Sequence, residues 1–289
     1  MYRGLDRSEL DRQYNNLARI PDHEAYAAGW SAASLQTRGS APCRLDVAYG
    51  DRPRERLDLF FPDDPGRLRA APIHAFIHGG YWYAQAKENF SYVAQGLIQE
   101  GVIVAVLDYE LCPDVDISEI VRQVRAALAW LWRNAEEFGG DPQRIFASGH
   151  SAGGHLTAMS LATDWAAFGD GLPNTLVKGG VTVGGVFDLE PIRLCFLNDI
   201  LGLDESMVRL ESPLYNLPVE PVSLVVAVGE CESAEFIRQS QEYADACRET
   251  GISVELMIVG EHHHVSVMNE LGREDGVITS AILRQIAIG

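Results

Sequence analysis

The stretch Gly149-His150-Ser151-Ala152-Gly153 directly follows the apolar run 144–148 and opens a helix-like stretch over residues 155–162. This is the setting of a nucleophile elbow, a sharp strand-to-helix turn with a serine at its apex. The flanking glycines carry no Cβ, so the backbone can pass close to its neighbours. The stretch predicts Ser151 as a nucleophile, but a G-x-S-x-G string alone also arises by chance in ordinary loops.

A second motif, His78-Gly79-Gly80-Tyr81-Trp82, stands at the end of another apolar run, residues 73–77. In α/β hydrolases an H-G-G segment after the third strand contributes backbone N–H groups to the oxyanion hole, alongside the residue after the nucleophile. Here the predicted donors are Gly79, Gly80 and Ala152. Two motifs, each in the expected strand context and in the expected chain order, occur together by chance much less often than a single motif does.

The chain has 289 residues, 47% of them hydrophobic, which allows a sizeable core. Its 23 basic and 41 acidic residues give a formal charge of −18, which repels phosphate backbones and anionic lipid surfaces and argues against nucleic-acid and membrane partners. No signal peptide is visible, and no stretch approaches the roughly 20 apolar residues of a membrane span. We expect a cytoplasmic protein. The sequence does not decide whether it is a monomer or a homodimer.

Eight short segments are predicted as strands: residues 44–49, 55–61, 73–78, 102–107, 144–149, 179–183, 223–228 and 253–259. The first two alternate polar and apolar residues, and the others are continuous apolar runs typical of buried parallel strands. Helical patterns occupy residues 90–100, 117–138, 153–162, 234–250 and 277–288. The alternation predicts an α/β fold, a mostly parallel, doubly wound, eight-stranded sheet with helices on both faces.

Residues 1–38 are predicted to be an N-terminal helical appendage to a catalytic domain over residues 39–289. Scattered apolar residues and Pro21 suit short amphipathic helices. The appendage either caps the pocket or packs on the outside, and the sequence does not separate the two. Residues 165–178 are expected to be a surface excursion.

A serine hydroxyl needs a base within hydrogen-bond reach, and the base needs an orienting group. In this fold the histidine follows the last central strand, where the chain has Gly260-Glu261-His262-His263-His264. His264 is favoured because it directly precedes the apolar run 265–268, and His263 is the alternative. Consecutive side chains point in different directions, and the five cysteines are scattered, so we expect free thiols and no metal site.

The orienting acid should follow the preceding strand, where the chain has Gly229-Glu230-Cys231-Glu232. Either carboxylate can accept the imidazole N–H and stabilise the imidazolium. Glu232 is favoured over Glu230. Asp188 lies too early in the chain and is expected to be structural.

Four segments together resemble one family: residues 78–82, Tyr109-Glu110-Leu111-Cys112-Pro113, residues 149–156, and residues 229–240. They resemble the serine-dependent arylformamidases, or kynurenine formamidases, of the α/β-hydrolase superfamily, near the hormone-sensitive-lipase-like esterases. The resemblance spans roughly residues 40–289. The Tyr-Trp after the glycines and the Tyr-Glu-Leu-Cys-Pro segment favour the formamidases over the lipase-like branch.

The resemblance implies acyl transfer through an acyl-enzyme, with Ser151 as nucleophile and His264 as base, on a small-molecule aryl formamide or related acyl amide or ester. It implies no metal and no organic cofactor. The family usually has aspartate in a Gly-Glu-x-Asp motif, whereas this chain has Glu232 there. Either the loop backs away to make room for the extra methylene, or Glu230 takes the role.

Aromatic residues beside the oxyanion segment, Trp82 and Tyr83, are expected to line the substrate pocket, with Phe187 and Phe196 as further candidates. Core packing is the alternative for each of them. The competing functions are a carboxylesterase or thioesterase for short acyl groups and a catalytically silent ligand-binding scaffold, because pocket residues rather than motifs set the substrate.

Overall fold

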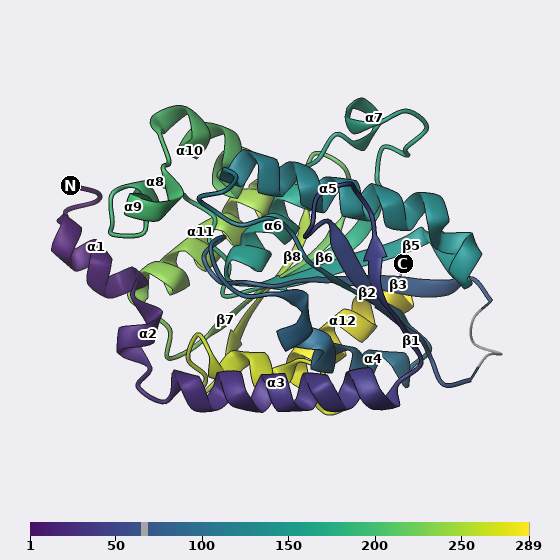
Figure 1. Ribbon diagram of the computed structural model, residues 1–289. Coiled ribbons are helices and arrows are strands. Elements are labelled where there is room, and N and C mark those ends of the chain that lie inside the picture. The colour runs from purple at the N-terminus through teal and green to yellow at the C-terminus, as the bar shows by residue number, and fades with distance from the viewer. Residues whose placement is uncertain (65–68, 289) are drawn as a thin grey trace.

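The computed structural model describes residues 1–64 and 69–288. An eight-stranded sheet in the order β1-β2-β4-β3-β5-β6-β7-β8 forms its centre (Figure 1). The strands are β1 (Cys43–Ala48), β2 (Arg56–Phe60), β3 (Ala71–Ile77), β4 (Ile103–Leu107), β5 (Gly140–His150), β6 (Val177–Val183), β7 (Ser223–Gly229) and β8 (Ser253–Val259). Only the pairs β1–β2 and β2–β4 are antiparallel. The predicted mostly parallel α/β-hydrolase sheet is confirmed.

Helices cover both faces of this sheet (Figure 1). One face carries α5 (Ile117–Asn134), α6 (Ala152–Leu161) and α11 (Ala234–Glu249). The other carries the 3₁₀ helix η2 (Lys87–Ala94), α4 (Gln95–Ile98) and α12 (Val277–Ile288), with α3 (His23–Ser40) packed against η2. The shorter helices are α1 (Arg7–Tyr14), α2 (Asn16–Arg19), α7 (Trp165–Phe168), α8 (Glu190–Arg193), α9 (Asn198–Leu201), α10 (Glu205–Glu211), η3 (Ala135–Phe138), η4 (Pro213–Tyr215) and η5 (Ser266–Glu270).

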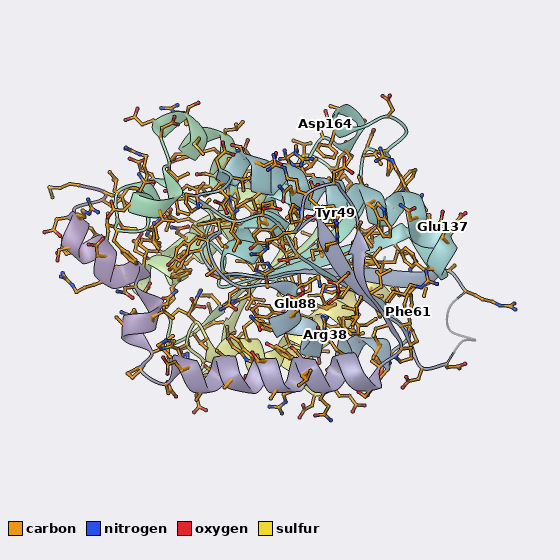
Figure 2. The ribbon with its side chains drawn as sticks, in the orientation of Figure 1. Arg38, Tyr49, Phe61, Glu88, Glu137 and Asp164 are labelled. Carbon is orange, nitrogen blue, oxygen red and sulfur yellow. The ribbon has the colours of Figure 1, made fainter. Side chains whose placement is uncertain are left out.

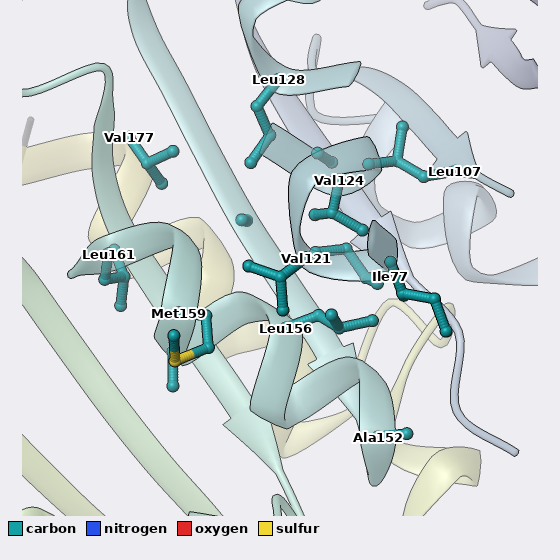
Figure 3. Close-up of a cluster of buried hydrophobic side chains, with 14 of the residues drawn as sticks. Ile77, Leu107, Val121, Val124, Leu128, Ala152, Leu156, Met159, Leu161 and Val177 are labelled. Atoms are coloured by element: carbon teal, nitrogen blue, oxygen red, sulfur yellow. The ribbon is translucent and has the colours of Figure 1, made fainter. Parts of the chain in front are cut away.

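The core between α5, α6 and the sheet positions the start of α6. Val121, Val124 and Leu128 recur at helical spacing, so they share the face of α5 that is turned towards the sheet. Figure 3 shows them packed with Ile77 of β3 and Leu156 of α6, and all five side chains are buried. This packing fixes α6 over the carboxyl ends of β3 and β5, where the sequence motifs lie.

A buried ion network joins α3 and η2 to the sheet. Lys87 on η2 contacts Asp58 of β2 at 3.0 Å and Glu88 at 2.7 Å, and Arg38 of α3 also pairs with Asp58. Figure 2 labels Arg38 and Glu88, which lie on these two elements beneath the sheet. Because an unpaired buried charge is costly, the two buried members Lys87 and Asp58 require each other. The network anchors α3 to the sheet at the end of the helix away from its N-terminus.

The N-terminal segment differs in detail from the expectation. Short helices α1 and α2 precede Pro21, but α3 is a single helix that continues past residue 38 to Ser40. Residues 190–215, to which the sequence assigned no helix, form α8, α9, α10 and η4. Within the described residues no helix has both the length and the apolar character that crossing a membrane requires.

Candidate active site

The candidate nucleophile Ser151 occupies a strained turn between β5 and α6, with φ 57° and ψ −118°. Such a conformation costs a non-glycine residue about 1–3 kcal/mol and persists only where its surroundings hold it. The Ser151 N–H donates to the carbonyl of Val183 at the end of β6 at 2.8 Å, and the Ser151 carbonyl accepts from His155 N–H at 3.1 Å. These bonds hold the serine at the carboxyl edge of the sheet.

The glycines of the elbow are required by close backbone contacts. A Cβ on Gly149 would lie 2.2 Å from the carbonyl oxygen of Gly153, and a Cβ on Gly153 would lie 2.0 Å from that of Ile77. Both separations are far inside van der Waals contact with groups that cannot rotate away. The G-x-S-x-G pattern therefore has a steric reason at each end of this turn.

We expect Gly153→Ala to destabilise the fold by about 2 kcal/mol or more, because the new Cβ must displace β3 or α6. The matched control is Gly29→Ala in α3, where a Cβ meets open space. That substitution should raise stability by up to about 1 kcal/mol, since alanine is the better helix former. Urea denaturation of the two variants and the wild type measures both effects. If Gly153→Ala were as stable as the wild type, the close approach of Gly153 to Ile77 would be relaxed in solution.

The predicted oxyanion segment packs directly against the elbow. A Cβ on Gly79 would lie 2.7 Å from the carbonyl of His150 and 3.0 Å from the Cβ of Ser151, and Gly80 has a φ of 105° that favours glycine. Gly79, Gly80 and Ser151 line the same cavity. Ala152 is the first residue of α6, so its N–H has no partner within the helix. The predicted donors are thus brought together at Ser151.

His78 holds the predicted oxyanion segment in place through contacts with its neighbours. Its ring lies between Asp108, at 3.0 Å from Nε2 to Oδ1, and the carbonyl of Gly79, at 2.8 Å from Nδ1. The Tyr109 hydroxyl donates to the carbonyl of His78 at 2.7 Å, and the two rings stack with centroids 4.2 Å apart. The segment that follows β4 therefore holds in place the segment that follows β3.

His264 and Glu232 form a buried hydrogen-bonded pair. Imidazole Nδ1 lies 2.6 Å from Oε2 of Glu232, and Oε1 of Glu232 accepts the Gly229 N–H at 3.1 Å. A carboxylate accepts hydrogen bonds, so this contact orients the ring with Nδ1 as the donor towards Glu232 and Nε2 on the opposite side. Glu230 is exposed and accepts the N–H of Glu261 at 3.1 Å instead. Of the two acids that the sequence left open, the structure places Glu232 at the imidazole.

The neighbouring histidines have other partners. His263 Nδ1 accepts backbone N–H groups of Val265 and Ser266 at 3.2 and 3.1 Å, and His262 Nδ1 lies 3.1 Å from the Ser266 hydroxyl. The three rings therefore occupy separate environments. Over residues 1–64 and 69–288, no group of three or more His, Cys, Asp or Glu side chains is arranged to hold a metal ion.

Gly184, which sequence reasoning missed, provides the space for the longer acid. Its φ is 51°, and a Cβ there would lie 2.8 Å from Oε1 of Glu232 and 3.1 Å from Nδ1 of His264. The glutamate carboxylate thus lies against a backbone that carries no side chain. The close contact shows how the extra methylene fits beside β6.

His150 links the elbow to the loop that carries His264. Its Nε2–H donates to the carbonyl of His264 at 2.7 Å, and the two rings lie 4.6 Å apart. Burial, reinforced by the neighbouring His264, holds the pKa of His150 well below its ordinary value, so this ring stays neutral. No local sequence pattern reports this role of His150, because its partner lies 114 positions away.

A cavity of about 230 Å³ opens onto Ser151 and His264, and its walls are mostly apolar. Tyr83 and Phe196 line it, as expected. The expectation for Trp82 is wrong, because this side chain is fully buried and its Nε1–H donates to His155 at 3.3 Å. Positive φ angles of 48° and 60° at Tyr81 and Trp82 reverse the chain, so Tyr81 lines the cavity and Trp82 enters the core.

The expectation for Phe187 as a pocket wall is also wrong. Its ring is buried in the core and stacks on Tyr243 with centroids 4.3 Å apart. A strand-end aromatic residue can point to either side of its loop, and here core packing holds Phe187 away from Ser151.

The N-terminal segment forms one wall of this cavity. Residues 14–17 and three residues of α3 line it. The Tyr81 hydroxyl donates to the carbonyl of Tyr14 at 2.6 Å, Asn16 Nδ2 donates to the Tyr81 hydroxyl at 3.1 Å, and the Tyr14 hydroxyl donates to Glu235 at 2.9 Å. These bonds hold the segment beside the serine, so it contributes to the pocket.

The fold and this site together define an α/β hydrolase with a serine elbow. The BD-FAE family model matches residues 57–185. An esterase B structure from Lactobacillus rhamnosis shares the fold, with a TM-score of 0.69, 21% identity, and coverage of 93% of this chain and 96% of that one.

Two relatives are more similar. A putative thioesterase structure from Silicibacter sp. TM1040 has 31% identity and a TM-score of 0.83, covering 95% of this chain and 99% of that one. The kynurenine formamidase of Danio rerio is 30% identical over 99% of this chain and 98% of its own length. The chain belongs to the kynurenine formamidase family and is a hydrolase.

Proposed function

We propose that this protein is a serine hydrolase that removes the formyl group from an aryl formamide such as N-formylkynurenine, through an acyl-enzyme on Ser151. The observation that carries the proposal is the 2.6 Å contact of His264 with buried Glu232. It lies beside a cavity that Ser151, Gly79 and Gly80 also line. Relatives from Danio rerio and Salmo salar named kynurenine formamidase, at 30% and 28% identity, support the choice of leaving group.

In the first half-reaction Ser151 Oγ attacks the formyl carbon while its proton passes to His264 Nε2. The carbonyl π electrons move onto oxygen, which the N–H groups of the oxyanion segment and Ala152 bind, each donor contributing about 3 kcal/mol. Glu232 stabilises the imidazolium. Collapse of the tetrahedral intermediate breaks the C–N bond, the aryl nitrogen takes the proton from His264, and the formyl group remains on Ser151.

Deacylation repeats these steps with water. The water gives a proton to His264 Nε2 and attacks the formyl ester, and release of formic acid returns the proton to Ser151 Oγ. An anilide-type nitrogen leaves more readily than an alkyl amine because the ring delocalises its electron pair. A site with the machinery of an esterase can therefore cleave an aryl formamide.

Hydrolysis of a thioester or short ester is the second candidate, because the 31% identical structure from Silicibacter is titled a putative thioesterase. The same serine chemistry would expel a thiol or alcohol. What separates the two activities is the leaving group, which this cavity must accommodate next to the oxyanion donors.

We expect the purified protein to hydrolyse N-formylkynurenine or formanilide with a larger kcat/KM than p-nitrophenyl butyrate or an acetyl thioester. Steady-state assays of the four compounds, with heat-denatured protein as background, measure the ranking. A large preference for the ester or thioester would favour the second candidate, an esterase or thioesterase, and contradict the proposed formamidase activity. Failure of a fluorophosphonate probe to label Ser151 in the folded protein would instead favour a ligand-binding scaffold.

We also infer that the protein acts in a reducing compartment such as the cytoplasm. All five cysteines are free, and three of them are buried. Proteins of oxidising compartments commonly pair their cysteines, whereas free buried thiols are usual in the cytosol. The catalytic steps above use none of these thiols.

A further inference from the structure

Two cavities lie next to each other along helix α3, which runs along the lower edge of the molecule in Figure 1. The α3 residues that line the cavity at Ser151 share one stripe of the helix surface. They are His23, Ala27 and Trp30. A neighbouring stripe lines the second cavity, of about 600 Å³, with Asp22, Ala25, Tyr26, Gly29, Trp30 and Ala33. Of the described residues, Trp30 alone lines both cavities.

The indole of Trp30 is held in place from several sides. It stacks on Tyr92 with centroids 6.4 Å apart, and the rings of Phe90 and Tyr26 lie at 6.0 and 6.5 Å. Its Nε1–H donates to the side-chain oxygen of Asn269 at 3.3 Å. Because these contacts fix the rotamer, the indole forms a wall between the substrate cavity and the second cavity.

The substrate cavity reaches solvent beside the N-terminal segment, where Leu17 lines it with an exposed side chain. Phe196 lines the cavity on this side, since its backbone N–H donates to Asp11 of α1 at 2.7 Å. An aryl leaving group carries ring substituents and must depart as the free amine, so it belongs on the side that reaches solvent. The acyl carbon then faces Trp30, where a formyl group presents only a hydrogen atom.

We propose that Trp30 sets the acyl specificity of this site, because its indole closes the cavity behind the acyl carbon. The site then accepts a formyl or other short acyl group and excludes a long chain. The inference rests on the proposed function, since it concerns the acyl group that the same serine accepts.

Removal of the indole would join the substrate cavity to the second cavity. Next to Trp30 the second cavity has mostly apolar walls, to which Ala33, Tyr92 and Leu271 contribute. A straight hydrocarbon chain attached to the acyl carbon could continue into this space and bury its methylene groups there.

The test is the ratio of kcat/KM for p-nitrophenyl octanoate to kcat/KM for p-nitrophenyl acetate. We expect the ratio to rise at least about tenfold in Trp30→Ala, because a pocket that accepts or rejects one methylene already changes kcat/KM by about tenfold or more. Trp30→Leu should raise the ratio part of the way, and it carries the test if Trp30→Ala does not fold. Trp30→Phe, which keeps a ring in place, should stay within about threefold of wild type.

Two further variants separate the opened wall from a general loosening of α3. Leu35→Ala changes an exposed residue of α3 that lines neither cavity, so it should leave the ratio unchanged. Gly29 lines the second cavity, and a Cβ there meets no atom within 4 Å. Gly29→Leu added to Trp30→Ala should therefore fill part of that cavity and lower the ratio severalfold.

An octanoate-to-acetate ratio in folded Trp30→Ala or Trp30→Leu within about threefold of wild type would overturn the inference. An unchanged ratio on adding Gly29→Leu would also overturn it, because the chain would then not enter the second cavity. The ratio of 4-butylformanilide to formanilide should not respond to Trp30→Ala, and a rise there instead would place the leaving group, not the acyl group, at Trp30. If the wild type hydrolyses none of these esters and formanilides, the proposed function itself fails.

Discussion

Ser151→Ala is expected to lower kcat for an aryl formamide by at least about 10⁴-fold, because the acyl-enzyme can no longer form. The loss should fall on kcat more than on KM. The side chain that is removed is the proposed nucleophile, whereas the aromatic walls of the cavity are untouched. Steady-state kinetics on the variant and the wild type, with formate release as the readout, measure the effect.

The fold of this variant should be preserved. The strained φ of 57° is already adopted by a residue with a Cβ, and the backbone bonds at Ser151 involve N–H and carbonyl groups that alanine retains. As a control, the circular dichroism spectrum and the thermal unfolding midpoint of the variant are compared with those of the wild type. Activity within about tenfold of wild type would place the nucleophile elsewhere, because residual catalysis by binding and oxyanion donors alone is far weaker.

The elbow and the strands that carry it could be predicted from sequence because each is a local pattern. Continuous apolar runs define the buried strands, and Gly149 is required by a contact within the turn itself, with the carbonyl of Gly153. His264 could be predicted as well, since its place after the last central strand follows from the chain order of the fold.

The remaining features depend on contacts between distant segments. The bond from His150 to the carbonyl of His264 joins the end of β5 to the loop that follows β8, and no local pattern reports it. The direction of Trp82 depends on two consecutive positive φ angles, which a motif of aromatic residues does not encode. Likewise, the bond from Tyr81 to Tyr14, which helps to hold the N-terminal segment beside the serine, joins residues 67 positions apart.

These long-range contacts have one effect in common, which is to fix the three loops of the candidate site relative to one another. Tyr109 bonds to the segment that carries Gly79 and Gly80, Val183 binds the Ser151 N–H, and His150 bonds to the loop that carries His264. Each contact is made by or to backbone at the carboxyl end of a strand. A site assembled from strand ends that are hydrogen-bonded in one sheet needs few additional bonds to keep its geometry.

Glu232→Gln is the second large effect that we expect, with kcat falling by about 10³–10⁴-fold, whereas Glu230→Gln should stay within about twofold of wild type. The amide cannot stabilise the imidazolium, and its NH₂ group, placed towards Nδ1, favours the tautomer in which Nε2 carries the proton and cannot act as base. The matched variant at Glu230 removes the same charge two residues away, where the carboxylate accepts only the Glu261 N–H.

Glu232→Asp, with a shorter acidic side chain, tests whether activity depends on the charge of the acid alone or also on the length of its side chain. Glu232→Asp retains the carboxylate but withdraws it from Gly184, against which the native carboxylate packs. We expect an intermediate loss, about tenfold in kcat, because the 2.6 Å contact to Nδ1 lengthens while the charge remains. Kinetics of the three variants on one aryl formamide give the ranking. A greater loss in Glu230→Gln than in Glu232→Gln would assign the orienting role to Glu230, and would mean that the loop carrying His264 rearranges when substrate binds.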